Sequence, residues 1–116
     1  MGLPEVSVVI CHHKGNHFVP NLLKSLKKSE HITYETIIVT STNMKFDADR
    51  NIICEFGPSI KRTVGAKYAL GRYIAFLDDD TEVDPDCLYE MVRVLRKPGV
   101  GMVYGKTYNM ERRMNF

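Results

Sequence analysis

One short stretch constrains the fold of this chain more than any other: the apolar run Tyr73–Leu77, followed at once by Asp78, Asp79 and Asp80. An unbroken apolar run too short for a helix predicts a strand buried on both faces, which is typical of a mostly parallel sheet covered by helices. Ligands bind at the carboxyl ends of the strands in such sheets. Neighbouring carboxylates repel one another, and a bound divalent cation relieves that repulsion. The stretch therefore predicts a metal-assisted site for a phosphorylated ligand, with a solvated acidic turn as the alternative.

Length and composition indicate one ordinary globular domain. The chain has 116 residues, of which 44% are hydrophobic and 26% are charged. The net charge of +2 is small and the basic residues are scattered, which argues against a nucleic-acid partner. No apolar stretch approaches the roughly 20 residues of a membrane span, and Glu5 and Ser7 interrupt any signal-peptide pattern. We expect a cytoplasmic protein, and a peripheral location at a membrane remains open.

The three cysteines, Cys11, Cys54 and Cys87, are an odd number and each has apolar sequence neighbours. We expect reduced core thiols, as in a cytoplasmic protein. Because no Cys-x-x-Cys spacing occurs, the sequence predicts no zinc site.

The first half of the chain alternates strand and helix. The β-branched run Val6–Cys11 predicts a first strand, and the polar loop His12–Asn16 follows it. Apolar spacing predicts a helix over about Phe18–Ser29. Its buried face is expected to contain Val19, Leu22, Leu23 and Leu26. A second strand is predicted over Tyr34–Thr40, and the polar stretch Ser41–Arg50 is expected to be a loop.

The sequence after Arg50 predicts a short third strand over Asn51–Glu55. A helix is predicted over about Ile60–Leu70, with Ser59 as its cap and Gly71 just beyond its end. The apolar line of this helix is expected to be Ile60, Val64 and Tyr68. Its first turn contains Lys61 and Arg62, and cations at a helix N-terminus oppose the macrodipole. A nearby anion would explain these two cations.

Asp84-Pro85-Asp86 predicts the start of another helix, with Asp84 as cap and Pro85 at its first position. Its core-facing residues are expected to be Leu88, Met91, Val92 and Leu95. Pro98-Gly99 ends that helix, and Val100–Gly105 predicts a fifth strand. The remaining Lys106–Phe116 has no partner element.

This order of elements predicts a doubly wound α/β sheet with helices on both faces. If the first and fourth strands are neighbours, the strand order is 3-2-1-4. The loop His12–Asn16 would then face Asp78–Asp80 across a ligand crevice.

The segment Gly57–Asp80 resembles the family 2 glycosyltransferases with the GT-A fold, a Rossmann-like α/β fold. These enzymes carry a pattern close to G-x-x-x-A-R-N-x-G-x-x-x-A-x-G-x-Y-I-x-F-L-D-x-D. The matching residues are Gly57, Arg62, Gly65, Ala69, Gly71, Tyr73, Ile74, Phe76, Leu77, Asp78 and Asp80. The resemblance extends back to Val6 and on to Gly105, and so covers nearly the whole chain.

The resemblance implies inverting transfer of a sugar from a nucleotide-diphosphate donor to an acceptor hydroxyl. Asp78 and Asp80 would be the ends of the Asp-x-Asp motif and the metal residues. Asp80 would coordinate Mg²⁺ or Mn²⁺ on the diphosphate, while Asp78 or Asp79 would reach the ribose or the waters of the metal. Carboxylate oxygens suit such a cation, which neutralises charge on the leaving diphosphate.

The resemblance also places donor contacts at Cys11, His12, His13, Thr40, Ser41, Arg62, Asp78 and Asp79. His13 would pack on the base, and Arg62 would offset the charge of the diphosphate. Thr40 and Ser41 depart from the family, which usually has two aspartates there. Both hydroxyls can hydrogen-bond a uracil-type edge without charge, so this departure leaves the base preference open and not the binding itself. The resemblance implies a UDP- or GDP-linked donor.

The general base of the family lies in an acceptor-binding half that follows, so the catalytic residue is unknown here. We expect residues 1–105 to form the nucleotide-sugar-binding domain and 106–116 to be the tail of a chain truncated before that half. The acceptor, a glycan or a lipid, is undetermined. An open sheet edge would favour a homo-oligomer. The alternative is a nucleotide- or metal-binding module, or a structural half-domain, without independent turnover.

Other nucleotide and phosphate folds fit less well. No Gly-x-x-x-x-Gly-Lys-[Ser/Thr] occurs, which argues against a P-loop enzyme. Receiver domains and dehalogenase-type phosphatases carry their acidic pair after the first strand, where this chain has Cys11, His12 and His13. A metal site of His12, His13 and His17 is a weaker alternative, because loop histidines are more often solvated.

Overall fold

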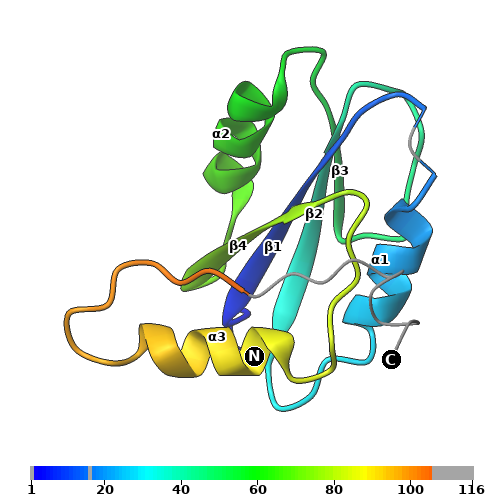
Figure 1. The fold of residues 1–116 in the computed structure, drawn as a ribbon. Helices are drawn as coiled ribbons and strands as arrows, with labels where there is room; N and C mark the ends of the chain where they lie inside the picture. Colours follow the sequence, from blue (N-terminus) through cyan, green and yellow to red (C-terminus); the bar gives the residue numbers. More distant parts are fainter. Residues whose placement is uncertain (1, 16, 106–116) are drawn as a thin grey trace.

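The fold, in a computed structural model that describes residues 2–15 and 17–105, is an α/β sheet with helices on both faces (Figure 1). Its strands are β1 (Val6–His12), β2 (Tyr34–Thr40), β3 (Arg50–Ile53) and β4 (Tyr73–Asp78). They pair in parallel in the order β3-β2-β1-β4. The first and fourth strands are therefore neighbours, which confirms the doubly wound arrangement.

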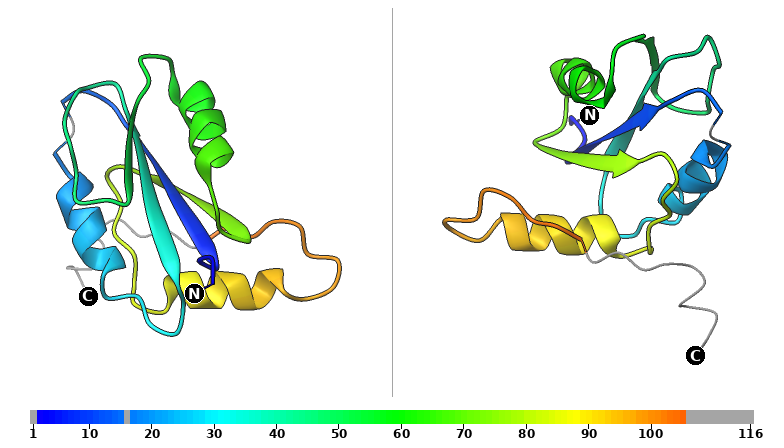
Figure 2. Two further views of the ribbon diagram at one scale, coloured as in Figure 1. Left: turned by 180° about the vertical axis from the view of Figure 1, so that it is seen from behind. Right: turned by 45° about the horizontal axis from the view of Figure 1, so that its top comes forward.

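Within the described residues, three helices cover the sheet: α1 (Val19–Leu26), α2 (Pro58–Tyr68) and α3 (Cys87–Leu95). Helices α1 and α3 lie on one face, whereas α2 lies on the other (Figures 1 and 2). None of the helices in the described ranges is long and apolar enough to cross a membrane.

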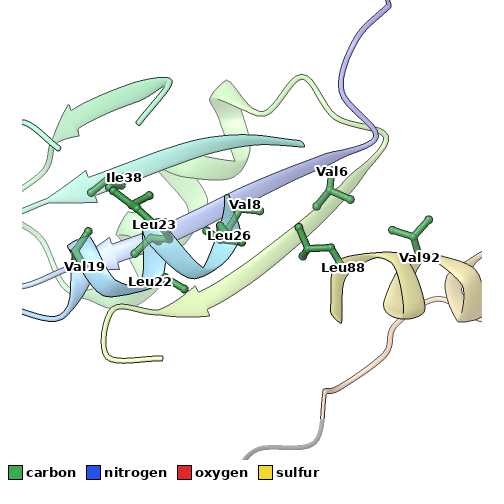
Figure 3. Close-up of a cluster of buried hydrophobic side chains, with 10 residues drawn as sticks. Val6, Val8, Val19, Leu22, Leu23, Leu26, Ile38, Leu88 and Val92 are labelled. Carbon is green, nitrogen blue, oxygen red and sulfur yellow. The ribbon is translucent and has the colours of Figure 1, made fainter. Parts of the chain in front are cut away.

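The larger core lies between the sheet and helices α1 and α3. Alternation along β1 points Val6, Val8 and Ile10 toward these helices. The four residues predicted for α1 are buried, and Leu88 and Val92 of α3 close over Val6 (Figure 3). Burying each such side chain contributes roughly 1.5–3 kcal/mol before entropy is counted. The periodicity therefore predicted the buried face of α1 in full and that of α3 in part, since Met91 and Leu95 are only half-buried.

The smaller core lies beneath α2 and differs from the prediction. The predicted apolar line was wrong, because Ile60 and Tyr68 are 48% and 43% exposed. The buried residues of α2 are Lys61 and Gly65. A Cβ added at Gly65 would lie 2.3 Å from Cγ1 of Val9, so the missing side chain lets the helix approach the sheet.

Several boundaries also differ. Ser59 is not a cap, since α2 begins at Pro58 after Gly57. Gly71 is not a helix-end residue with positive φ; a Cβ there would lie 2.6 Å from the backbone nitrogen of Ser7. Helix α3 begins at Cys87 rather than at Pro85, after a turn in which the Cys87 N–H donates to the Asp84 carbonyl. Helix α1 ends at Leu26 instead of Ser29, and β3 is displaced toward Arg50.

The two remaining differences concern β4 and the segment after α3. Burial of β4 on both faces was wrong, because Ile74 and Phe76 are 40% and 49% exposed. The predicted fifth strand, 100–105, is also wrong: within the described residues this segment forms no strand, and its Met102 and Tyr104 are exposed. The edge of β4 away from β1 therefore has no strand beside it in residues 2–15 and 17–105. Lys106–Phe116 lies outside the described residues.

Candidate functional site

The candidate site lies at the carboxyl ends of β1 and β4. The strand register aligns Cys11 with Asp78. Beyond that pair, the His13 N–H donates to Oδ2 of Asp79 at 3.3 Å. The loop after β1 therefore faces the acidic segment, as the strand order predicts.

The acidic segment is a tight turn at the end of β4. The N–H and the hydroxyl of Thr81 both donate to the Asp78 carbonyl oxygen, at 3.2 and 2.7 Å. This turn leaves Asp78 and Asp80 exposed and Asp79 half-buried. The geometry puts the two outer carboxylates at the sheet edge where a ligand has access.

Among the described residues, no cluster of three or more His, Cys, Asp or Glu side chains could hold a metal by itself. Mg²⁺ is commonly held by one or two carboxylates together with substrate phosphates and water. The exposed oxygens of Asp78 and Asp80 fit this second kind of site, in which the ligand completes the coordination.

A pocket of about 320 Å³ opens between the end of β1 and the start of α2. Its lining residues are Cys11, His12, His13, Glu55, Phe56, Gly57, Pro58 and Lys61. Phe56 is 66% exposed at this site, and Cys11 places its Sγ 3.9 Å from the Pro58 carbonyl oxygen. The pocket thus has apolar and aromatic walls and lies beside the acidic turn.

His12 and Thr40 join the ends of β1 and β2. His12 is 1% exposed, and its Nδ1 lies 2.8 Å from Oγ1 of Thr40. The Thr40 hydroxyl also lies 2.9 Å from that of Thr42, while Phe46 packs edge-on against the His12 ring. Thr40 and Ser41 are not among the residues that line the pocket. Their predicted contact with a base stays a prediction.

Cys11 lines the pocket, and Arg62 is close enough for its charge to act on the Cys11 thiol. Burial raises the pKa of the Cys11 thiol, and the charges of Arg62 and Lys61 partly oppose that rise. Arg62 is exposed and does not line the pocket, but its charge acts on a residue that does. Of the predicted donor contacts, the structure brings Cys11, His12 and His13 to the pocket.

Lys61 is the site residue that the sequence reasoning missed. It is 3% exposed and lines the pocket from the first turn of α2. Its position beside Arg62 at a helix N-terminus suggested an anion nearby, but only the fold shows which of the two cations turns inward.

Comparison with protein families gives one match. The model for glycosyl transferase family 2 matches residues 51–113, which is more than half of the chain. The chain belongs to glycosyltransferase family 2. The matched part begins in β3 and contains α2, β4 and the acidic turn, so the resemblance in Gly57–Asp80 is confirmed. A comparison with curated protein sequences gave no match.

Solved structures of TarS from S. aureus share the fold of this family 2 chain. The complex of TarS 1-349 with UDP-GlcNAc has a TM-score of 0.67 at 18% identity, covering 86% of this chain and 37% of that one. The complex with UDP has the same TM-score, identity and coverage of this chain, and 38% of that chain is covered. TarS 1-349 alone gives a TM-score of 0.65 at 19% identity, with 78% and 32% covered. The chain spans about a third of the length of these proteins. This likeness shows the GT-A type of fold.

Proposed function

We propose that this chain forms the nucleotide-sugar-binding domain, over residues 1–105, of an inverting glycosyltransferase. The enzyme would transfer a sugar from a UDP- or GDP-linked donor to a hydroxyl of a glycan or lipid acceptor. One observation carries the proposal: in a family 2 chain, an open pocket adjoins exposed carboxylates at the carboxyl ends of β1 and β4. This edge is where open α/β sheets bind ligands.

The proposal assigns Asp78 and Asp80 to a divalent cation, Mg²⁺ or Mn²⁺, shared with the donor diphosphate. When bound, the cation would neutralise the charge that develops on the leaving diphosphate. Arg62 is exposed nearby and would offset the same charge. Asp79 accepts from the His13 N–H and would hold the β1 loop in position beside the ligand.

The nucleoside would occupy the pocket, between His13 and the start of α2. Phe56 and His13 are both exposed there and offer rings on which a base can stack. His12 and Thr40 would support the pocket from below, because their hydrogen bond joins the strand ends. The general base that activates the acceptor would come from outside residues 1–105.

The proposal extends to location and assembly. Cys11, Cys54 and Cys87 are all free, in keeping with a reducing compartment, and we infer a cytoplasmic protein. β4 exposes apolar side chains and, among residues 2–15 and 17–105, has no strand beside its outer edge, as self-associating sheets do. A homo-oligomer would form through this edge.

The test is calorimetric titration of UDP and of GDP, each with and without Mn²⁺. Wild type should bind at least one nucleotide with Mn²⁺, and Asp80→Ala should weaken that binding at least about tenfold, because a charged ligand to the metal is lost. Asp86→Ala is the matched control, since Asp86 is exposed and its side chain forms no capping hydrogen bond. Absence of nucleotide binding would refute the proposal. Binding that depends on neither Mn²⁺ nor Asp80 would favour a nucleotide-binding module without a metal-assisted donor site.

A further inference from the structure

Lys61 is a buried cation with no partner in the described part of the chain. The whole residue is 3% exposed, and its ammonium, which is not fully sealed from solvent, forms no hydrogen bond or ion pair with any described residue. Glu55 lines the same pocket, yet the two form no ion pair. Lysine is almost never this buried unless it is paired, so a partner for its ammonium is expected on the side of the pocket that it lines.

The position of Lys61 at the pocket indicates what would pair with it. The residue belongs to the first turn of α2, where the helix dipole adds positive potential to that of the ammonium. The ammonium has donors and no acceptor. A ligand group that fits here must therefore offer acceptor oxygens.

The residues that line the pocket indicate which part of the ligand binds in it. Cys11, Phe56 and Pro58 are apolar or aromatic, and they suit a flat ring more than a bare phosphate. Phosphates have their own place beside the pocket, at the carboxylates of the β4 turn, since Asp78 is in register with Cys11. The ring in the pocket is then the nucleobase.

We infer that Lys61 reads the nucleobase and selects bases with a keto oxygen on the edge away from the ribose. This rests on the proposed nucleotide-sugar function and assigns the base preference to Lys61 in place of Thr40 and Ser41. Uracil and guanine present such an oxygen, whereas cytosine and adenine present an amino group at the same place. The amino group of cytosine or adenine and the ammonium of Lys61 are both hydrogen-bond donors, so they cannot pair and the charge of Lys61 would stay unpaired. A site of this kind discriminates strongly against these two bases.

The experiment is titration of UDP, CDP, GDP and ADP with constant Mn²⁺ into wild type and Lys61→Met. UDP and CDP differ only in their pyrimidine ring, so their ratio of affinities isolates the base. Wild type should prefer UDP over CDP, and GDP over ADP, by at least about tenfold. Lys61→Met should reduce both preferences to within about threefold, because methionine fills the space without a donor. Lys67→Met, an exposed lysine of the same helix, should keep both preferences.

A second variant and a second ligand complete the test. Lys61→Gln carries both a donor and an acceptor, so its affinity for CDP should rise relative to UDP. Circular dichroism establishes that each variant is folded. Inorganic pyrophosphate should bind equally well to wild type and Lys61→Met.

Three results would overturn the inference. The first is a wild type that binds UDP and CDP alike, and the second is a Lys61→Met that retains the preference. The third is a pyrophosphate affinity that falls in Lys61→Met as much as that for UDP, since Lys61 would then contact the diphosphate. In each case nucleotide binding itself would persist and the proposed function would stand. Loss of all nucleotide binding in wild type would refute both.

Discussion

Ser7 of β1 donates a 2.6 Å hydrogen bond to the carboxylate of Glu35 of β2 in the protein interior, where these residues are 0% and 8% exposed. The Leu70 N–H donates to the same carboxylate oxygen at 2.7 Å, and the Gly71 N–H donates to the Ser7 hydroxyl at 2.7 Å. These bonds join β1, β2 and the connection between α2 and β4. They lie near the amino ends of the strands, at the opposite end of the sheet from the candidate site.

Replacement of Glu35 tests this network. Glu35→Ala should lower the free energy of unfolding by about 2–4 kcal/mol, because it leaves the buried Ser7 hydroxyl and the part-buried Leu70 N–H without their acceptor. Glu35→Gln keeps one acceptor oxygen and should cost about half as much. Urea denaturation measures both variants. Equal losses would mean that the packing of the side chain matters and its hydrogen bonds do not.

The contact between α2 and the sheet depends on Gly65. Alanine normally stabilises a helix interior relative to glycine by about 1 kcal/mol. Here its Cβ would lie 2.3 Å from Cγ1 of Val9 and 3.3 Å from Cγ2 of Val39, and valine side chains adjust poorly. Gly65→Ala should therefore destabilise the protein by about 1–3 kcal/mol in thermal or urea unfolding.

Gly101 supplies the control for that prediction, because a Cβ added there meets nothing within 4 Å. Gly101→Ala should change the free energy of unfolding by less than about 0.5 kcal/mol. A Gly65→Ala variant as stable as wild type would show that α2 can move away from the sheet at little cost.

Much of the fold could be predicted from sequence periodicity. The bounds of β2 agree with the prediction, and the buried face of α1 does as well. Helix α2 could not be read in this way, because its buried residues are a lysine and a glycine and neither carries a hydrophobic signal. The exposure of Ile74 and Phe76 on β4 could not be predicted either, because an apolar run has the same sequence pattern whether or not both of its faces are covered.

The site was predictable only in part, for a related reason. The acidic turn and the loop after β1 follow from strand ends, and the sheet order brings them together. Which side chains point inward depends on helix rotation and on local hydrogen bonds. The sequence alone therefore favoured Arg62 over Lys61, and it did not show that the Thr40 hydroxyl is bonded to His12.

Asp79 should act by positioning the loop after β1. Asp79→Ala removes the acceptor of the His13 N–H, so the loop should loosen and UDP should bind about three- to tenfold more weakly. Asp79→Asn keeps a side-chain oxygen and should retain most of the affinity. Faster hydrogen exchange at the His13 amide in Asp79→Ala, without nucleotide, would be the structural signature. An unchanged exchange rate would count against this role.

The edge of β4 should mediate self-association. Phe76 is 49% exposed on that strand and Ile74 is 40% exposed, and no strand of the described part of the chain pairs with the outer edge of β4. Light scattering should give a dimer or larger species for wild type and a monomer for Phe76→Lys. Leu3→Lys, which changes an exposed apolar residue outside the sheet, should leave the assembly unchanged. A monodisperse monomer of wild type would contradict the prediction.

The thiols of Cys11 and Cys87 should titrate above the ordinary thiol value of about 8.5. Burial is the main cause of the raised pKa of Cys11, and burial also raises the pKa of Cys87, with smaller contributions from Asp84 and Asp86. The folded state thus holds the thiol protons more tightly than the unfolded state. The contribution of these thiols to stability should be fully present below the ordinary thiol pKa, and it should be lost as pH rises from that value through the raised pKa of the folded state.

Alkylation separates the two thiols by their positions. At pH 8 both should react with iodoacetamide more slowly than free cysteine, because the thiolate is the nucleophile and burial disfavours it. Cys11 lines the pocket and Cys87 belongs to α3, so UDP with Mn²⁺ should slow the reaction of Cys11 and leave that of Cys87 unchanged. Peptide mass spectrometry measures both rates in one sample. Equal protection of the two residues would indicate a general stiffening of the fold. If UDP does not protect Cys11, the proposal that the nucleotide binds in this pocket is wrong.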